Sequence, residues 1–474
     1  MLVALGFLMV ATFMALIMTK RMTPLLALII VPTVFGLFAG AGLGLGDMVM
    51  DAVKSMSGTA ALLMFAIMYF GIMIDVGLFD KLVDGILKLV GNDPAKVVMG
   101  TAVLTGLISL DGDGSTTFIV VTAALLPIYQ RLGMSPVVLT CVAGLTNGTL
   151  NIVPWGGPTA RAAAALHVDA SAIFVPMIPA LAIGLVVVFT FAWIMGVSER
   201  KRLQREDPLR WGPGSVMDGG TGGSTGSGNT NTPAGGRGVA LLEKVAVRGD
   251  GTEAATMNGT VLDPTRETLR PKLFWFNLSM TVAIFVLLIL DLMPLSYLFM
   301  IGTAVALLVN FPKISDQAKM IASHASSVIA VVSMVLAAAV LTGVLSGTGM
   351  VDAMSAWLVD VIPTSMGPYL AILTGIISIP ATFFMSNDAF YFGILPVLTE
   401  AGAHYGIPAV DMARASITGQ PVHMQSPLVP AILLLVSMAK VDLGDHHKKV
   451  LWRAAVVSLV MLAVGVLTGA IGIG

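Results

Sequence analysis

Hydrophobic positions along the chain gather into runs that are long enough to cross a membrane, separated by short polar segments. A helix needs about 17 to 25 mainly apolar residues to cross roughly 30 Å of hydrocarbon. The pattern predicts two sets of five such helices, at residues 2–18, 23–45, 58–77, 136–168 and 171–197 and at 273–291, 294–311, 325–347, 408–438 and 450–472. The composition agrees, because 56% of the 474 residues are hydrophobic and 11% are charged, unlike a soluble domain. The sequence therefore predicts an all-α polytopic membrane protein.

Several motifs occur twice in the same order. "GIMIDVGLFD" (71–80) has its glycines and last aspartate at the spacing found in "GVLSGTGMVD" (343–352), and "LTGLISL" is followed in the second half by "LTGIISI". Because five spans are expected in each half, the second half must enter the membrane in the opposite orientation, as in the inverted repeats of secondary transporters. The expected units are a first repeat, a flexible cytoplasmic linker and a second repeat, at 1–197, 198–272 and 273–474.

Basic residues indicate the orientation. If the N-terminus lies outside, Lys20, Arg21 and the basic cluster in "ERKRLQRED" (199–207) all lie on the cytoplasmic side, as the positive-inside rule requires. The expected location is the cell (inner or cytoplasmic) membrane. The net charge of −1 argues against a nucleic-acid partner.

Two polar segments interrupt the hydrophobic parts of the sequence. "LDGDGSTT" (110–117) and "SNDAF" (386–390) each follow one apolar arm and precede another. The arms 97–110 and 368–380 are expected to be too short to cross comfortably, and a carboxylate at mid-bilayer costs roughly 2.5 to 3.5 kcal/mol. Non-helical backbone at that depth survives inside protein or beside a water-filled cavity. We therefore expect two re-entrant hairpins, at about 97–129 and 368–399.

The fourth span of each half is expected to be a broken helix. Residues 136–168 would form a helix of about 50 Å, and "TNGTLNIVPWGGPTA" (146–160) interrupts them with two prolines and three glycines. The corresponding span is interrupted by "TGQPVHMQSP" (418–427). Helix ends expose N–H groups and positive dipole ends, which bind anions. Two hairpin tips and two breaks therefore predict one anion-binding cavity.

The candidate binding residues are the polar and glycine positions of these four segments: Asp111, Gly112, Asp113, Gly114, Ser115, Thr116, Asn147, Thr149, Asn151, Gly156, Gly157, Thr159, Ser386, Asn387, Asp388, Gln420, His423, Gln425 and Ser426.

Each candidate has a structural alternative. Asp111 and Asp113 also suit a tight turn before glycine, and the Asn and Thr side chains also suit the backbone of a broken helix. His423 is either a proton carrier or a packing residue. Arg161 either clamps a carboxylate or faces a vestibule or a dimer contact, whereas His446 and His447 are expected in a solvated loop.

"SLDGDGSTTF", "GLTNGTLNIVPWGGPTARAAAAL" and "QPVHMQSPLVPA" resemble the citrate–divalent metal/proton symporter family of the ion transporter superfamily, and the resemblance extends over nearly the whole chain outside 206–270. It implies uptake of citrate as a complex with a divalent cation, coupled to protons. It also implies a homodimer of elevator type, with a scaffold part and a moving transport part. No permanently bound cofactor is expected.

The dicarboxylate branch of that superfamily is a weaker match. Its Ser-Asn-Thr signature is met by Ser386 and Asn387, but Asp388 replaces the threonine, and the first tip has no asparagine. Additional carboxylates suit a hard divalent cation, which prefers oxygen ligands. Asp111, Asp113 and Asp388 are therefore the expected contacts of a substrate-borne metal.

Charge favours the same interpretation, because moving a citrate trianion inward against 100 mV would cost about 7 kcal/mol, whereas a divalent chelate carries one negative charge.

Two alternatives share the fold: sodium-coupled di- or tricarboxylate transport and sodium/proton antiport. An intramembrane enzyme or sensor is the alternative of another class. It lacks support, since no H-E-x-x-H or G-x-S-x-G motif indicates hydrolysis.

Overall fold

The computed structural model describes residues 1–474 apart from residues 20, 212–265, 291 and 364, and the described residues form helices and connecting turns without a strand. Proline and aspartate mark many helix starts. Asp93 caps a helix that begins at Pro94, and its carboxylate accepts a hydrogen bond from Ala95 N at 3.0 Å. A proline in the first turn loses no helical hydrogen bond, and the aspartate satisfies a free N–H group. These starts are therefore fixed by local sequence.

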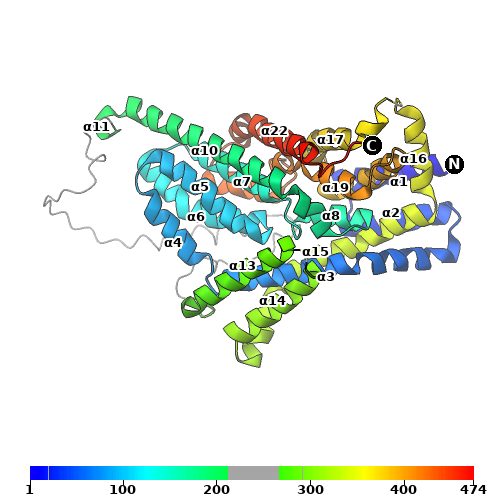
Figure 1. The fold of residues 1–474 in the computed structure, drawn as a ribbon, viewed down its shortest axis with the longest axis horizontal. Coiled ribbons are helices and arrows are strands. Elements are labelled where there is room, and N and C mark those ends of the chain that lie inside the picture. The colour runs from blue at the N-terminus through cyan, green and yellow to red at the C-terminus, as the bar shows by residue number, and fades with distance from the viewer. Residues whose placement is uncertain (20, 212–265, 291, 364) are drawn as a thin grey trace.

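One group of helices is built around α3 and α15, and we call it the α3–α15 group. α3 packs against α15 and α14, α15 also packs against α2, and α1 and α13 pack against α2 and α14 respectively. In Figure 1, α2, α3, α13, α14 and α15 lie along the lower part of the molecule. The bounds are α1 (Leu2–Met18), α2 (Pro24–Phe38), α3 (Leu45–Asp75), α13 (Phe274–Leu290), α14 (Leu295–Asn310) and α15 (Ile314–Gly347).

A second group of helices, which we call the core bundle, contains the two hairpins, the two interrupted helices and the long helices α10 and α22 (Figure 1). In it α10 packs against α5 and α22, α22 against α7, and α6 against α21. Its members are α5 (Pro94–Ile108), α6 (Gly114–Leu132), α7 (Pro136–Leu150), α8 (Gly157–Leu166), α10 (Ile178–Glu206), α17 (Leu370–Phe384), the π-helix η6 (Ala389–Ile394), α18 (Leu395–Ala403), α19 (Ala409–Ile417), α20 (Gln420–His423), α21 (Pro430–Ala439) and α22 (Leu443–Leu467). α8 also contacts α3 and α15, and η6 contacts α1 and α15. These two elements therefore lie where the two groups meet.

Short elements connect the long helices. They are the α-helices α4 (Asp80–Val90), α9 (Ala170–Phe174), α11 (Pro208–Trp211) and α16 (Met350–Val361), and the 3-10 turns η1 (Gly42–Gly44), η2 (Ser109–Asp111), η3 (Val175–Met177), η4 (Pro271–Leu273) and η5 (Gly367–Tyr369).

The order of elements is similar in the two halves. α3 is followed by Gly77 at φ 84° and then α4, and α15 is followed by Gly349 at φ 70° and then α16. Both glycines adopt the left-handed conformation that L-residues with a side chain avoid. A helical hairpin, an interrupted helix and a long final helix follow in each half. The matched motifs at 71–80 and 343–352 thus occupy the same kind of turn.

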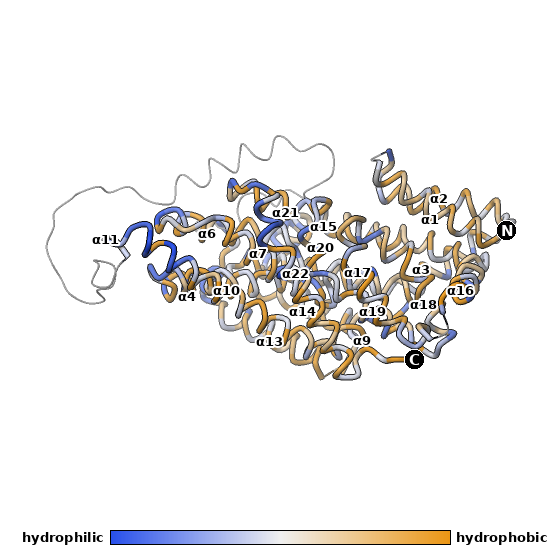
Figure 2. The backbone as a smooth tube through the Cα atoms, turned by 90° about the horizontal axis from the view of Figure 1, so that it is seen from above, coloured by the Kyte–Doolittle hydropathy of each residue, from blue (hydrophilic) through white to orange (hydrophobic). Residues whose placement is uncertain are grey.

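Seven helical stretches of the described residues are long and apolar enough to cross a membrane, in agreement with a polytopic protein. Figure 2 shows hydrophobic residues along most helices and hydrophilic residues at the C-terminal end of α10 and at α11. The stretches are Gly42–Asp75, Pro94–Asp111, Ala170–Glu206, Pro271–Leu290, Ile314–Gly347, Gly367–Phe384 and Leu443–Leu467.

Two expectations about lengths are wrong. The hairpin arms span Pro94–Asp111 and Gly367–Phe384, and each has 18 residues, enough to cross. The length of the arms therefore does not establish re-entry, which stays a prediction. The third span of each half begins much earlier than expected, at Leu45 and Ile314, because a helix continues beyond its apolar segment wherever its polar side chains reach water.

Both ends of the expected linker are structured. α10 continues to Glu206, so the basic cluster is helical. At the other end Arg266 donates from Nε to Asp75 O at 3.0 Å and from Nη2 to Ile74 O at 3.1 Å, and its guanidinium lies 2.8 Å from Asp80. The Gly/Ser/Thr-rich stretch at 212–265 lies outside the described residues.

Candidate functional site

The first hairpin tip is closed by its own aspartates. Asp113 precedes α6 and accepts from Ser115 N at 3.0 Å and from Thr116 N and Oγ1 at 3.1 and 2.6 Å. Asp111 accepts from Asp113 N at 2.8 Å, and the Gly112 between them adopts φ 81°. Asp111 is buried and Asp113 is exposed. Both carboxylates therefore serve the turn, while the side chain of Asp113 remains accessible.

This tip rests on the first broken helix. Trp155, in the break between α7 and α8, donates from Nε1 to Leu110 O at 2.8 Å. Asn147 of α7 donates from Nδ2 to Ser109 Oγ at 2.9 Å. Within the described part of the chain its buried Oδ1 has no hydrogen-bond partner, and a methyl group at Gly114 would lie 3.1 Å from it. Asn147 thus directs an unused acceptor toward the start of α6.

The second hairpin tip reaches the first half of the chain. It lies between α17 and η6, where Ser386 Oγ accepts from Ala389 N at 3.2 Å. Asp388 is buried, and its Oδ1 accepts from Arg161 Nε of α8 at 2.6 Å. Arg161 lies about one turn after the start of α8. The residue before this helix, Gly156, provides no side-chain cap. The tip and the break therefore share an ion pair between residues far apart in sequence.

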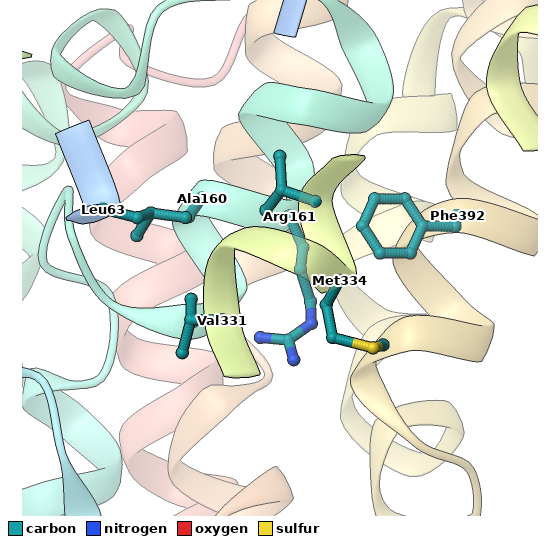
Figure 3. A pocket seen from close by; sticks show the side chains of 8 residues that line it. Leu63, Ala160, Arg161, Val331, Met334 and Phe392 are labelled. Atoms are coloured by element: carbon teal, nitrogen blue, oxygen red, sulfur yellow. The ribbon is translucent and has the colours of Figure 1, made fainter. Parts of the chain in front are cut away.

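Figure 3 shows the guanidinium group of Arg161 extending between Val331 and Met334 of α15. It lines a small pocket at the junction of the core bundle and the α3–α15 group. The pocket is lined by Leu63, Gly157, Ala160, Arg161, Val331, Met334, Val335 and Phe392. The sequence left Arg161 open as a carboxylate clamp or as a residue facing a vestibule or a dimer contact, and here it pairs with the carboxylate of Asp388. Its role in binding stays a prediction.

An amide network joins the second tip to both breaks. Gln420, at the start of α20, accepts at Oε1 from Asn151 Nδ2 at 3.0 Å. Its Nε2 donates to Tyr391 OH at 3.0 Å and, more weakly, to Asn387 Oδ1 at 3.3 Å. Three predicted residues are thus brought together. Tyr391 was not predicted, because a tyrosine within an apolar run has no sequence feature that separates binding from packing.

The two broken helices cross in direct contact. A Cβ at Gly148 of α7 would lie 3.0 Å from Pro421 Cα, 3.1 Å from Pro421 O and 3.1 Å from Met424 Cβ. No residue larger than glycine fits such an approach without movement, because two of the three atoms belong to backbone. Gly148 therefore fixes the distance between the two breaks.

Other predicted hydroxyl residues bond to the backbone. Thr149 Oγ1 donates to Leu145 O at 2.8 Å, and Thr159 Oγ1 donates to Ile152 O at 2.8 Å. Ser426 Oγ donates to Phe383 O at 2.6 Å. In this conformation these three side chains satisfy the backbone around the breaks and the end of α17, which is the structural alternative stated for the two threonines.

The histidines differ in role from each other. His423 is buried, and its Nδ1 must carry a proton because its partner, 2.6 Å away, is the carbonyl oxygen of Thr382. The expectation that His446 and His447 lie in a solvated loop is wrong. Both belong to α22, and His446 is fully buried, with Nε2 3.1 Å from Gln425 Oε1. Gln425 also donates to Gly144 O at 2.9 Å, so it joins α22 to α7.

Among the described residues, no group of three or more His, Cys, Asp or Glu side chains is arranged to hold a metal ion. Asp388 is occupied by Arg161, and Asp113 by the N-terminus of α6. Contacts from Asp111, Asp113 and Asp388 to a metal that arrives with a substrate stay a prediction.

The chain is similar in sequence to citrate transporters. The family model described as "Citrate transporter" matches residues 2–419. A citrate transporter of Bacillus subtilis (strain 168) is 47% identical over 471 residues, covering 99% of this chain and 100% of its own. A Mg2+/citrate complex secondary transporter of the same organism is 44% identical over 477 residues, covering 100% of both chains. The crystal structure of the Alcanivorax borkumensis YdaH transporter aligns at a TM-score of 0.49 with 13% identity, over 90% of this chain and 89% of that one.

Proposed function

The chain belongs to the citrate transporter family and is a secondary transporter rather than an enzyme, and from this we propose that it imports citrate as a complex with a divalent metal ion, together with protons. The observation that carries the proposal is the Arg161–Asp388 pair beside the Asn151–Gln420–Asn387 network. This site offers a cation to a carboxylate, an anion to a metal and amides to the remaining oxygens.

Each group has a chemical partner in such a complex. Guanidinium groups bind carboxylates with directed, charge-assisted hydrogen bonds. Carboxylate oxygens are the ligands that Mg2+ and other hard cations prefer. A relative that is 44% identical is named a Mg2+/citrate complex secondary transporter. These points support the metal complex as the transported species.

The charge of the complex supports proton coupling. A complex of citrate with a divalent cation keeps one negative charge, so its entry against a negative interior costs about 2.3 kcal/mol per 100 mV. Two accompanying protons would make entry electrically favourable. The buried His423 is one proposed carrier, because its Nδ1 hydrogen is committed to Thr382 O and its Nε2 is the atom that would take up a proton. Asp111, Asp113 and Asp388 are the others.

For the transport step we propose inverted repeats and movement of the core bundle against the α3–α15 group. α8 and η6 contact both groups, and Ala160 and Ala164 of α8 are buried in one hydrophobic cluster with residues of α3 and α15. Small side chains on a helix leave a smooth surface for sliding. We further propose re-entrant hairpins, a homodimer in the cell membrane, an external N-terminus and a cytoplasmic linker.

Uptake of labelled citrate into proteoliposomes tests the proposal. Mg2+, Ca2+, Mn2+, Ni2+ or Zn2+ would each be supplied with citrate, and EDTA would replace them in a parallel sample. We expect uptake only with a metal, and stimulation by an inwardly directed proton gradient. Uptake that is unchanged in EDTA would overturn the metal complex, and dependence on a sodium gradient alone would favour sodium-coupled transport.

A further inference from the structure

The Arg161–Asp388 pair uses a small part of its binding capacity. A guanidinium has five N–H donors and a carboxylate accepts at both oxygens, yet the contact joins only Nε and Oδ1, at 2.6 Å. Within the described ranges, neither head group makes another hydrogen bond. The two terminal amino groups of Arg161 and Oδ2 of Asp388 are therefore available to a ligand.

The surroundings make an unpaired charge costly here. The side chains of Arg161 and Asp388 are only 25% and 12% exposed. The pocket that Arg161 lines is otherwise formed by aliphatic, thioether and phenyl side chains and by Gly157. An ion that loses its partner in apolar surroundings is left without compensation, which is far more unfavourable than leaving the pair intact. Each charge thus needs a partner in every state of the site.

We propose that this ion pair occupies the empty site in place of the substrate, and that it opens when the metal–citrate complex binds. A carboxylate of citrate then takes over Arg161, and the metal takes over Asp388. Both protein charges remain paired before and after binding. This inference rests on the proposed function and names the residues that select the complex over its parts.

Selection follows because each component alone satisfies one residue. Uncomplexed citrate would pair with Arg161 but would leave Asp388 unpaired and close to further negative charge. A free cation would pair with Asp388 but would leave Arg161 unpaired. The complex presents both charges at once, so it alone replaces the contact that it breaks.

Binding measurements on the purified full chain in lipid nanodiscs test this selection. Isothermal titration with citrate plus Mg2+, with citrate plus EDTA, and with Mg2+ alone gives a selectivity ratio, the Kd of free citrate divided by that of the complex. Asp388→Asn keeps the shape but removes the charge, so Arg161 becomes available to free citrate. We expect the ratio to fall roughly 10- to 100-fold, through weaker binding of the complex and tighter binding of free citrate.

Arg161→Gln should favour the free cation, whereas Asp388→Asn favours free citrate. It frees Asp388, so we expect measurable binding of Mg2+ alone and weaker binding of both citrate forms. Asp411→Asn is the matched control, because Asp411 pairs with Arg414 at 2.8 Å with 11% and 14% of the side chains exposed. The other hydrogen bonds of this pair go to Ala172, Ala470 and Gly472 and not to the hairpin tip. The selectivity ratio of Asp411→Asn should equal that of the unsubstituted protein.

A purely structural pair predicts other results. Both single variants would then lose thermal stability while the ratio stayed constant, and that outcome would overturn the inference. If Asp388→Asn fails to fold, Arg161→Lys decides, because it keeps the charge but lacks the two terminal amino groups. We expect it to weaken binding of the complex about tenfold, whereas a structural role predicts no change. Absence of Mg2+–citrate binding by the unsubstituted protein would instead refute the proposed function, and the inference with it.

Discussion

A single methyl group at Gly148 should push the two broken helices apart. In Gly148→Ala the new Cβ would lie 3.0 to 3.1 Å from Pro421 Cα, Pro421 O and Met424 Cβ, whereas carbon atoms pack best at about 3.5 to 4.0 Å. The helices must therefore separate by several tenths of an ångström. Overpacking of this kind costs about 1 to 3 kcal/mol, and the better helix propensity of alanine returns up to about 1 kcal/mol.

Gly106→Ala is the matched control. Its Cβ would lie 3.6 Å from Thr146 Cγ2 and 3.7 Å from Leu150 Cδ1, which are ordinary contacts. The gain in helix propensity is common to both variants, so the difference in their free energies of unfolding isolates the overpacking term. We expect Gly148→Ala to be less stable than Gly106→Ala by about 1 to 3 kcal/mol.

Two assays check the prediction. Equilibrium unfolding in mixed micelles compares the stabilities, and initial rates of citrate uptake into proteoliposomes compare function. Because Gln420 lies next to Pro421 and bonds to Asn151 across the crossing, separation of the helices should also lower uptake, by about tenfold or more for a displacement approaching 1 Å. Equal stability and equal uptake in the two variants would refute the view that this crossing sets the site geometry.

Three other outcomes are expected. Asp113→Ala should lose about 1 kcal/mol of stability through the cap of α6, while Asp113→Asn should keep the cap but lose uptake; an active, stable Asn variant would limit Asp113 to the turn. In a Cys141→Ala background, Ser115→Cys should react with impermeant thiol reagents faster in inside-out vesicles and Asn387→Cys faster in right-side-out vesicles; equal labelling from both sides would contradict opposed hairpins. Residues 218–237 lie outside the described residues and the repeat, so their deletion should leave uptake nearly unchanged. The measurement is the rate of citrate uptake by a deletion variant that inserts normally into the membrane.

Breaks and tips could be predicted from sequence because their causes are local. Proline removes a backbone donor and glycine permits a left-handed turn, so Pro154 and Gly156 marked the first break and Gly112 the first tip. The family resemblance also rested on these segments, and the match of residues 2–419 to citrate transporters confirms it. Local chemistry thus located the site in the chain.

Lengths and partners were harder to predict. The first hairpin arm was placed too late, although Asp93 and Pro94 form a standard helix start. His446 was assigned to a loop because it follows several polar residues, yet Asp442 caps α22 just before it. Whether such a histidine faces water or α7 depends on tertiary contacts. The pairing of Arg161 with Asp388 likewise joins residues 227 positions apart in the sequence. The hydrophobic pattern of the sequence predicts helices but not contacts between distant residues.

The segment after the linker caps a helix of the first half of the chain. This contact matters for any experiment that produces the two halves as separate polypeptides. Arg266 and Thr268 donate to the last carbonyl groups of α3, and Arg270 N donates to Val76 O at 3.0 Å. Helix C-termini need such donors. A polypeptide that starts shortly before Arg266 would therefore carry the C-terminal cap of a helix that belongs to the other fragment. If the halves were produced as separate chains, each would be incomplete alone, and this cap would form only on their reassembly.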